Sequence, residues 1–340
     1  MAFIHWFSRA IDYPLATPRV MQISLTFRCN LACRMCSLSN SLPASEELST
    51  AQIRHAIDEA AAYRIPEVLF TGGEPFLRPD IFELCGYVAS KGMRSIITTN
   101  AAVPVEDIPR RLVRSGVGHV HISVDGLEAT HDFFRGTGVF AKMTVFLEAL
   151  NGVRQGKFSV GIACTVMDNN IGELRDLFML ADSLGVDVMN FQPLVKDNGN
   201  FDDRGRSPFW VKPENIARLE EQVHLIKGCR TRHLSLYEEP SIGLLPKYYA
   251  EKIGSRDWRC FGGFKTVFIC FSKGQPLVYS CHGICGNLDT MSLKQAWMSA
   301  EAWKLRRHSR FCRQPCLQSC YSQESAQSLN NLVRFLCQKN

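Results

Sequence analysis

Thr26-Phe27-Arg28-Cys29-Asn30-Leu31-Ala32-Cys33-Arg34-Met35-Cys36 is the stretch that decides the architecture of this chain. It begins at the end of an apolar run at 22–27 that is typical of a β-strand, and its three cysteines have a C-x3-C-x2-C spacing. Iron–sulfur clusters are held by cysteine thiolates, and a four-iron cubane takes four ligands. This loop supplies three, which leaves one iron open for a ligand that is not protein. A chelating substrate or cofactor needs that arrangement.

A zinc site and merely buried cysteines are the alternatives for this loop. Structural zinc takes four protein ligands, commonly in C-x2–4-C pairs. The loop places three thiols close together with no fourth ligand nearby, which suits a cluster better than zinc. We therefore predict an iron–sulfur cluster held by Cys29, Cys33 and Cys36.

Length and composition indicate a globular protein. The 340 residues can bury a large core and are enough for more than one domain. The net charge is +6, but the basic residues fall in short clusters such as Arg110-Arg111 and Arg306-Arg307. Such clusters are typical of solvated helix faces, so we expect no nucleic-acid partner. No run of 18 apolar residues predicts a membrane span.

The cysteines indicate the cellular compartment. Fourteen are present, and they gather in one group at 29–36 and another from Cys260 onward. The N-terminus lacks the basic region and apolar core of a signal peptide. We therefore expect a cytoplasmic protein whose cysteines bind metal rather than form disulfides.

Predicted strands alternate with predicted helices from residue 22 to residue 194. The strands are expected at 22–27, 67–71, 94–99, 119–124, 159–166 and 187–194, and the helices at about 49–63, 80–91, 105–115, 139–154 and 170–184. This alternation implies parallel strands joined by right-handed crossovers. Six such units predict an α/β fold, a partial (β/α)6 TIM-like barrel. Functional residues of such barrels lie at the C-terminal ends of strands, where the three-cysteine loop begins.

We predict four regions along the chain: an N-terminal arm at 1–20, the barrel at 21–210, a bridging segment at 211–255 and a small cysteine-rich domain at 256–340. The bridging segment begins with a helix near 213–228 and then shows no clear period. The cysteine-rich domain is expected to contain a β-hairpin, a turn from Gly286 to Asp289 and a helix from Leu293 to Leu305.

The ends of the other strands carry further candidates. Strand two ends in Thr71-Gly72-Gly73-Glu74-Pro75, where two glycines let the backbone approach a ligand and free amides with Glu74 suit a charged amino group. Strand three ends at Asn100, which could equally cap a turn. Strand four ends at Ser123 and Asp125, whose oxygens can hydrogen-bond hydroxyl groups.

Two residues have open interpretations. Arg135, in His131-Asp132-Phe133-Phe134-Arg135-Gly136-Thr137-Gly138, is either structural or a binding residue for a carboxylate. Cys164 lies in strand five, where we expect a buried small residue. The alternative for Cys164 is a thiol that returns a hydrogen atom to a substrate radical.

With Gly72-Gly73-Glu74-Pro75 after the second strand, the three-cysteine loop resembles the signature of the radical S-adenosylmethionine (radical SAM) enzymes. In that family the open iron of a [4Fe–4S] cluster chelates SAM, an electron from the cluster cleaves the sulfonium, and the 5′-deoxyadenosyl radical removes a hydrogen atom from the substrate. The family usually has an aromatic residue where this chain has Met35, which affects only an expected contact to adenine.

The resemblance implies roles for the residues that match. Cys29, Cys33 and Cys36 hold the SAM-binding cluster. The cofactor-binding residues are Gly72, Gly73 and Glu74 for the methionine part of SAM, Ser123 and Asp125 for its ribose, Arg135 for its carboxylate, and Asn100 as a weaker candidate.

The C-terminal region resembles the SPASM or twitch extensions of radical SAM enzymes, which carry auxiliary [4Fe–4S] clusters. By their order, Cys260, Cys281 and Cys320 are assigned to a first auxiliary cluster, and Cys312, Cys316 and Cys337 to a second. Further alternatives are a ligand role for Cys270 or Cys285, a single cluster, a core position for Cys337, and a zinc module.

The resemblance implies a radical SAM oxidoreductase or maturase. Its substrate would be a peptide or a small molecule that is oxidised, cross-linked or epimerised, and its electron donor a reductase such as flavodoxin or ferredoxin. The competing class is a non-catalytic iron–sulfur electron carrier or redox sensor, which would have no need of a cofactor pocket at Gly72-Gly73-Glu74-Pro75.

Overall fold

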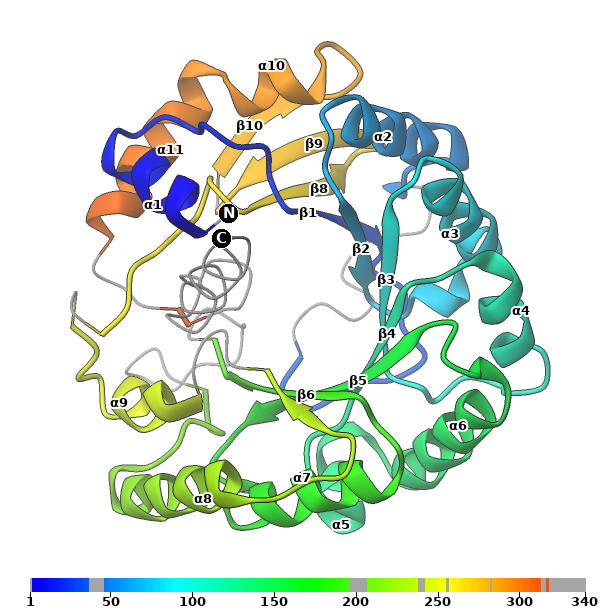
Figure 1. The fold of residues 1–340 in the computed structure, drawn as a ribbon, viewed down its shortest axis with the longest axis vertical. Helices are drawn as coiled ribbons and strands as arrows, with labels where there is room; N and C mark the ends of the chain where they lie inside the picture. The colour runs from blue at the N-terminus through cyan, green and yellow to red at the C-terminus, as the bar shows by residue number, and fades with distance from the viewer. Residues whose placement is uncertain are drawn as a thin grey trace, which may run out of the picture.

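The fold is one ten-stranded sheet that curves into an open barrel, with helices on its outer side (Figure 1). The computed structural model describes residues 2–36, 46–195, 207–237, 242–254, 257–281, 283–312 and 316–317. The strand order is β10-β9-β8-β1-β2-β3-β4-β5-β6-β7. The strands are β1 (Val20–Thr26), β2 (Glu67–Gly72), β3 (Arg94–Thr99), β4 (His119–Ser123), β5 (Ser159–Val166), β6 (Val188–Pro193), β7 (Ser235–Leu236), β8 (Thr266–Ser272), β9 (Gln275–Ser280) and β10 (Gly283–Asn287).

The helices of the described residues follow the strands in the order expected for an α/β barrel. They are α1 (Ala2–Ala10), α2 (Thr50–Ala62), α3 (Ile81–Ser90), α4 (Ile108–Ser115), α5 (Glu128–Arg135), α6 (Val139–Arg154), α7 (Leu174–Ser183), α8 (Ile216–Gly228), α9 (Leu245–Tyr249), α10 (Leu293–Trp297) and α11 (Ala300–Phe311). By length and hydropathy, none of these helices could cross a membrane.

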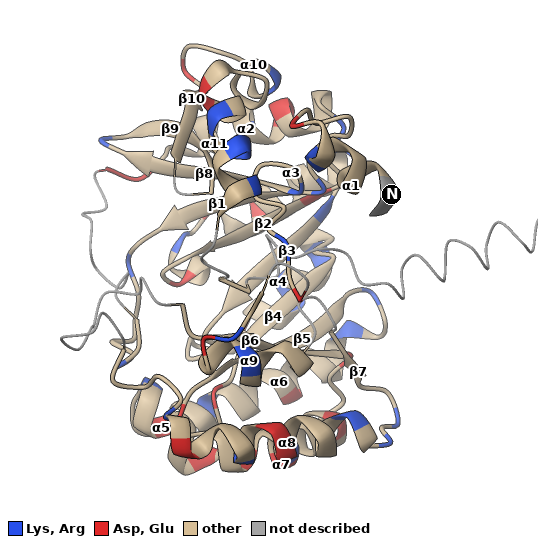
Figure 2. Cartoon of the chain, turned by 90° about the vertical axis from the view of Figure 1, so that its left-hand side faces the viewer, with Lys and Arg blue, Asp and Glu red and all other residues tan. Residues whose placement is uncertain are grey.

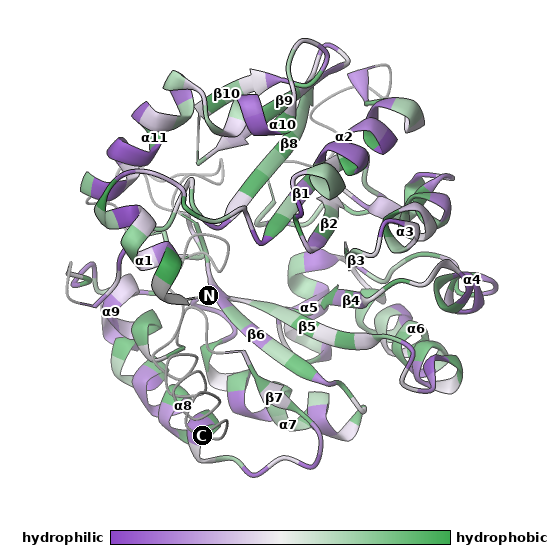
Figure 3. Ribbon diagram, turned by 45° about the horizontal axis from the view of Figure 1, so that its top comes forward, coloured by the Kyte–Doolittle hydropathy of each residue, from purple (hydrophilic) through white to green (hydrophobic). Residues whose placement is uncertain are grey.

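The six strands predicted from the sequence are β1 to β6, and each pairs in parallel with the next. This confirms the partial (β/α)6 barrel. The two faces of the sheet differ because successive side chains of a strand point to opposite sides. Ile23, Phe70 and Ile122 belong to the fully buried set that packs on the helices. The alternate set, which includes Thr98 and His121, is only partly buried and lines the concave face; Figure 3 shows the hydropathy of each residue along the strands.

Several elements differ from the expectation. The structure adds α1, α5, α9, β7 and β10, none of which the sequence predicted. Gly286 and Asn287 belong to β10 rather than to a turn, so the turn starts two residues later than expected, at Leu288. The helix expected from Leu293 to Leu305 is broken, because the Ser299 side chain accepts the N–H of Ala302 at 3.1 Å and starts α11 there.

The C-terminal hairpin extends the sheet of the barrel. β8 pairs in parallel with β1, from Val20 opposite Thr266 to Ile23 opposite Ile269. β8 and β9 are joined by Lys273 and Gly274, whose φ angles of 50° and 71° are those of a two-residue hairpin turn. The cysteine-rich region and the barrel therefore share one sheet, and the domain boundaries stay predictions.

Two neighbouring histidines lie on β4, where the side chain of His119 is buried and that of His121 is partly buried. The ring centres of His119 and His121 are 4.3 Å apart, and His119 Nδ1 lies 2.6 Å from Ser159 Oγ. Burial lowers the pKa of His119 to about 2 and that of His121 to about 4. The folded protein therefore keeps both rings neutral at a pH where the unfolded chain, with a histidine pKa near 6.5, binds protons.

We expect the free energy of unfolding to fall as the pH drops below about 6.5. Each buried ring contributes a loss of roughly 1.4 kcal/mol per pH unit until its folded pKa is reached. Urea unfolding of wild type and of His119→Gln/His121→Gln between pH 7 and pH 5 measures this. Burial raises the pKa of Glu74 to about 7, a contribution of opposite sign that cancels in the comparison. Equal pH slopes for the two proteins would contradict the prediction.

Candidate functional site

The three-cysteine loop follows the C-terminal end of β1, as the sequence predicted. Cys29 and Cys33 are half-buried, and Cys36 is exposed. The end of α5 holds the loop, because the N–H of Arg34 donates to the carbonyl oxygen of Phe134 at 2.9 Å. The thiols thus lie at the open end of the barrel and remain accessible.

Gly72 and Gly73 hold the backbone that leads into this loop. The N–H of Gly73 donates to the carbonyl oxygen of Thr26 at 2.7 Å, and that of Glu74 donates to Arg28 at 2.9 Å. A Cβ atom on Gly72 would lie 2.1 Å from the Thr26 oxygen, and one on Gly73 would lie 2.1 Å from the Arg28 oxygen. The expectation of free backbone amides is therefore wrong for Gly73 and Glu74, because both N–H groups donate hydrogen bonds to the chain that leads to Cys29.

Glu74 is fully buried, which was not expected of a residue for a charged amino group. Its carboxylate accepts the N–H of Phe76 at 3.1 Å, the hydroxyl of Thr99 at 2.9 Å and the N–H of Asn100 at 2.8 Å. Burial raises the pKa of the Glu74 carboxyl to about 7, although these hydrogen bonds act in the opposite direction and lower it. In this structure Glu74 fastens the end of β3 to the turn after β2, while Gly72 and Gly73 stay partly exposed.

Asn100 reaches the three-cysteine loop directly. Its Nδ2 donates to Asn30 Oδ1 at 2.8 Å and lies 3.6 Å from the sulfur of Cys29. Its Oδ1 accepts the N–H of Ala102 at 2.8 Å, which fixes the orientation of the amide. A donor aimed at sulfur favours the thiolate form, the form that binds metal.

Asp125 and Arg135 form a buried ion pair behind the loop. Arg135 Nε donates to Asp125 Oδ2 at 2.7 Å, and the other oxygen accepts the N–H of Thr165 at 2.8 Å. Asp125 has no exposed surface, and both of its oxygens accept hydrogen bonds within the protein, so its contact to the ribose stays a prediction. Ser123, at the end of β4, is partly exposed.

The Cys33 thiol interacts electrostatically with the thiols of Cys29 and Cys36 and with the guanidinium of Arg135. Burial raises the pKa of Cys33 to about 11; Arg135 opposes this shift, and the thiolates of Cys36 and Cys29 add to it. Bound iron would reverse the balance, because a metal-bound thiol is deprotonated. Three neighbouring thiols with a cation and an amide donor beside them fit a cluster. Among the described residues, no three Cys, His, Asp or Glu side chains converge on a single ion.

Sequence reasoning missed Glu47. Its carboxylate accepts from Arg28 Nε at 2.8 Å, from Arg78 Nη1 at 3.3 Å and from the hydroxyl of Thr26. Glu47 therefore connects the chain at Thr26 and Arg28 to Arg78, which follows the turn after β2. Only 8% of its side chain is exposed. No local motif marks this position, since its partners come from β1 and from the turn after β2.

Cys164 is a buried core residue, as the simpler interpretation of strand five expected. It has no exposed surface, and its sulfur lies 3.9 Å from the Nδ2 of Asn170. Burial holds its pKa well above the ordinary value. The alternative, a hydrogen-atom donor at this position, stays a prediction that the burial of the thiol does not support.

A second group of thiols lies beside α11. Cys260 is buried, Cys281 and Cys316 are half-buried, and Cys312 is exposed. Burial raises the pKa of Cys260 to about 12, the N–H of Gly262 opposes the shift, and negative charge on Cys316, Cys281 or Cys312 adds to it. The backbone of Cys260 lies beside the end of α11, since Arg9 donates to the carbonyl oxygens of both Cys260 and Arg310. The sequence had divided these cysteines between two clusters, and that division stays a prediction.

The remaining C-terminal cysteines stand apart from this group or outside the described residues. Cys270 is half-buried on β8, and Cys285 is buried beside the guanidinium of Arg306. None of the four grouped thiols affects the pKa of either. Cys320 and Cys337 lie outside the described residues.

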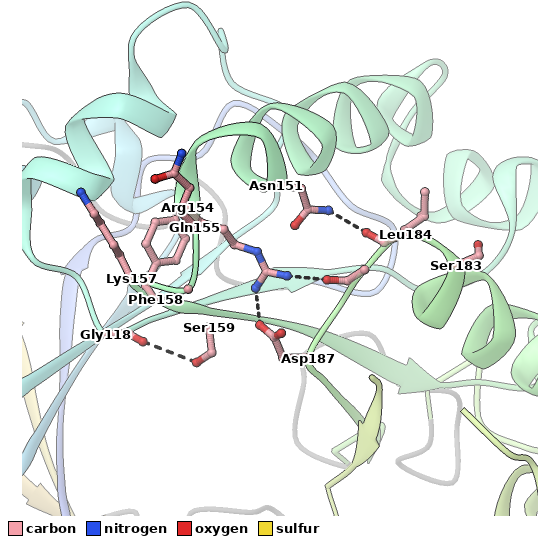
Figure 4. Close-up of a pocket in the computed structure, with 12 residues that line it drawn as sticks. Gly118, Asn151, Arg154, Gln155, Lys157, Phe158, Ser159, Ser183, Leu184 and Asp187 are labelled. Carbon is pink, nitrogen blue, oxygen red and sulfur yellow. Dashed lines mark hydrogen bonds and ion pairs between the residues drawn. The ribbon is translucent and has the colours of Figure 1, made fainter. Parts of the chain in front are cut away.

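A cleft of about 810 Å³ lies at the opposite end of the sheet (Figure 4). Its lining side chains are engaged with one another: Arg154 pairs with Asp187, and Asn151 Nδ2 donates to the carbonyl oxygen of Leu184 at 2.7 Å. The N-terminal ends of barrel strands serve stability rather than catalysis. The candidate site is therefore the three-cysteine loop, not this cleft.

Known proteins are similar to this chain in sequence and in architecture. Residues 23–181 match the profile of the radical SAM superfamily. The chain is 30% identical over 307 residues to the AdoMet-dependent heme synthase of Methanosarcina barkeri, an alignment that covers 84% of each chain. It is 28% identical over 330 residues to the PqqA peptide cyclase of Rhodopseudomonas palustris, covering 93% of this chain and 83% of that one.

The fold is similar to that of solved structures. SuiB of Streptococcus suis superposes with a TM-score of 0.68 at 16% identity, over 89% of this chain and 71% of that one. At this identity the likeness concerns the architecture alone: the partial barrel with its extension.

Proposed function

Because this chain belongs to the radical SAM superfamily, we propose that Cys29, Cys33 and Cys36 hold a [4Fe–4S] cluster at which SAM is reductively cleaved. A hydrogen atom is then removed from a peptide or small-molecule substrate. The observation that carries the proposal is the three-thiol loop at the end of β1, which the backbone of the partly exposed Gly73 contacts through its hydrogen bond to Thr26. The family uses a [4Fe–4S] cluster and SAM, which together supply the radical chemistry when bound.

Two residues around the loop favour the thiolate form of its cysteines, which is the form that binds iron. Arg135 places a positive charge near Cys33, and Asn100 directs an N–H toward Cys29, so both favour thiolates. We propose that SAM lies against the partly exposed Gly72, Gly73 and Ser123. Arg135, paired with Asp125, is a positioning residue in this proposal.

We propose that Cys260, Cys281, Cys312 and Cys316 hold one auxiliary [4Fe–4S] cluster. Four thiols match the ligand number of a complete cubane, and each of the other three affects the pKa of Cys260. This arrangement leaves no protein-free iron, so the auxiliary cluster would serve electron transfer rather than SAM binding.

We propose that the substrate binds on the concave face of the sheet. The side chains there, such as Thr98 and His121, are polar and partly exposed. The relatives that align over most of this chain include a heme synthase and a peptide cyclase, so tetrapyrroles and peptides are the two classes to test. Oxidation, cross-linking and epimerisation are the reaction types to test, and the burial of Cys164 does not favour it as a hydrogen-atom donor for epimerisation.

Iron content and SAM cleavage test the proposal together. Anaerobically reconstituted protein should hold about eight irons per chain, from two four-iron clusters. With SAM and dithionite it should form 5′-deoxyadenosine. We expect Cys36→Ala to lose about four irons and all 5′-deoxyadenosine, because the SAM-binding cluster loses a ligand.

The matched control is Cys312→Ala, which should also lose about four irons but keep SAM cleavage. Twelve irons in wild type would indicate two auxiliary clusters. A fully loaded wild-type protein that forms no 5′-deoxyadenosine would favour the electron carrier or redox sensor instead.

A further inference from the structure

The outer face of α11 exposes two large aromatic side chains. Trp303 is 44% exposed and Phe311 is 67% exposed. Arg307 lies midway, and its guanidinium is 5.4 Å from the centre of the Trp303 ring. Residues four apart share one face of a helix, so these three form a continuous stripe. We call Trp303, Arg307 and Phe311 the α11 stripe.

The surroundings of the α11 stripe are basic, as the blue segments of α11 in Figure 2 show. Lys304 and His308 are exposed on the same helix, and Glu301, in the first turn, is its one acidic residue. Arg310 pairs with Asp12 at 2.9 Å, which neutralises the nearby carboxylate. Aromatic side chains with arginine form the energetic centres of protein interfaces, and complementary charge steers the partner to them.

The α11 stripe ends directly at the second group of thiols. Phe311 is followed by Cys312, the exposed member of the group. Arg9 of α1 donates to the carbonyl oxygen of Cys260 at 2.8 Å and to that of Arg310 at 3.0 Å, so α1 clamps the end of α11 to the segment of Cys260. Figure 1 shows α1 beside α11. A protein bound to the stripe would therefore lie next to these thiols.

We propose that the α11 stripe is the docking surface for an acidic one-electron carrier protein of the flavodoxin or ferredoxin type. The inference rests on the auxiliary cluster of the proposed function: Cys260, Cys281, Cys312 and Cys316 would hold the group that accepts one electron from the carrier's reduced centre. A small apolar centre with a charged rim is typical of transient redox complexes, which bury less than about 1,200 Å². An anionic membrane would match the charge but would not account for the position beside the thiols.

Binding of a purified flavodoxin to the loaded full-length chain tests this surface. By surface plasmon resonance at low salt, we expect Lys304→Glu/Arg307→Glu to weaken binding at least about ten-fold and to reduce its salt dependence. Trp303→Ser/Phe311→Ser should weaken it at least about five-fold without changing the salt dependence. Basic cytochrome c, the control protein, should not bind the wild type.

Matched controls lie on other helices. Arg110→Glu, an exposed charge reversal on α4, and Val145→Ser, at an apolar residue that is 53% exposed on α6, should leave the dissociation constant unchanged. SAM cleavage driven by dithionite should survive in all the variants, whereas flavodoxin-driven cleavage should fall with the stripe variants. Loss of dithionite-driven cleavage in wild type would count against the proposed function instead.

Three results would overturn the docking surface. The first is unchanged flavodoxin binding in both stripe variants. The second is stripe-dependent retention on phosphatidylglycerol vesicles in a protein that does not bind flavodoxin. The third is a stripe-dependent dimer in light scattering, again without flavodoxin binding.

Discussion

Gly73→Ala should remove the cluster from the three-cysteine loop. The new Cβ would lie 2.1 Å from the carbonyl oxygen of Arg28, which is backbone and cannot rotate aside. Either the hydrogen bond from Glu74 to Arg28 breaks, or the chain entering Cys29 shifts by about an ångström. Because a misplacement of that size costs about a hundred-fold in rate, we expect 5′-deoxyadenosine formation to fall by at least that factor.

Iron analysis and SAM cleavage of the reconstituted variant measure the effect. About four of the eight irons should be lost, since the auxiliary group lies elsewhere. Gly152→Ala is the matched control: Gly152 lies within α6, its added Cβ would meet no atom within 4 Å, and alanine favours a helix. A Gly73→Ala protein with full iron and wild-type cleavage would show that the loop does not depend on this close approach.

The close approach of Gly73 to Arg28 could not be predicted from the sequence, although the elements on either side of it could. The six parallel strands and the position of the three-cysteine loop follow from local alternation, because apolar runs and loops are encoded within a few residues. The use of Gly73 by the loop is a contact between β1 and the turn after β2. Only the path of both segments in space reveals it, and a motif that signals glycine does not say which backbone comes close.

Long-range pairing also explains the other differences. Asp125 was expected to bind a ligand and Arg135 either to bind one or to be structural; in the structure the two side chains pair with each other, and their contacts to SAM stay predictions. Cys312 and Cys316 were separated from Cys260 by their order in the sequence. In the structure the end of α11 lies against the segment of Cys260, because carbonyl oxygens of both accept hydrogen bonds from Arg9, a residue on a helix that the sequence did not predict.

Arg135→Met should destabilise the folded protein strongly. It removes the partner of a carboxylate that has no exposed surface and leaves the Asp125 charge buried. Breaking a buried pair from one side costs about 3–5 kcal/mol, because the remaining ion has neither water nor a counter-charge. Urea unfolding at neutral pH measures the loss. Cys33 also loses the cation that favours its thiolate, so cluster loading should fall in the variant that remains folded.

The control for Arg135→Met is Arg175→Met, which breaks the pair with Asp176, whose side chains are 48% and 61% exposed. An exposed pair contributes about 0–1 kcal/mol, so this variant should unfold close to wild type. Adding Asp125→Asn to Arg135→Met should restore part of the stability, because the buried charge is then gone while an amide oxygen can still accept the N–H of Thr165. If the double variant were no more stable than the single one, the cost would lie in lost packing of Arg135 rather than in the charge of Asp125.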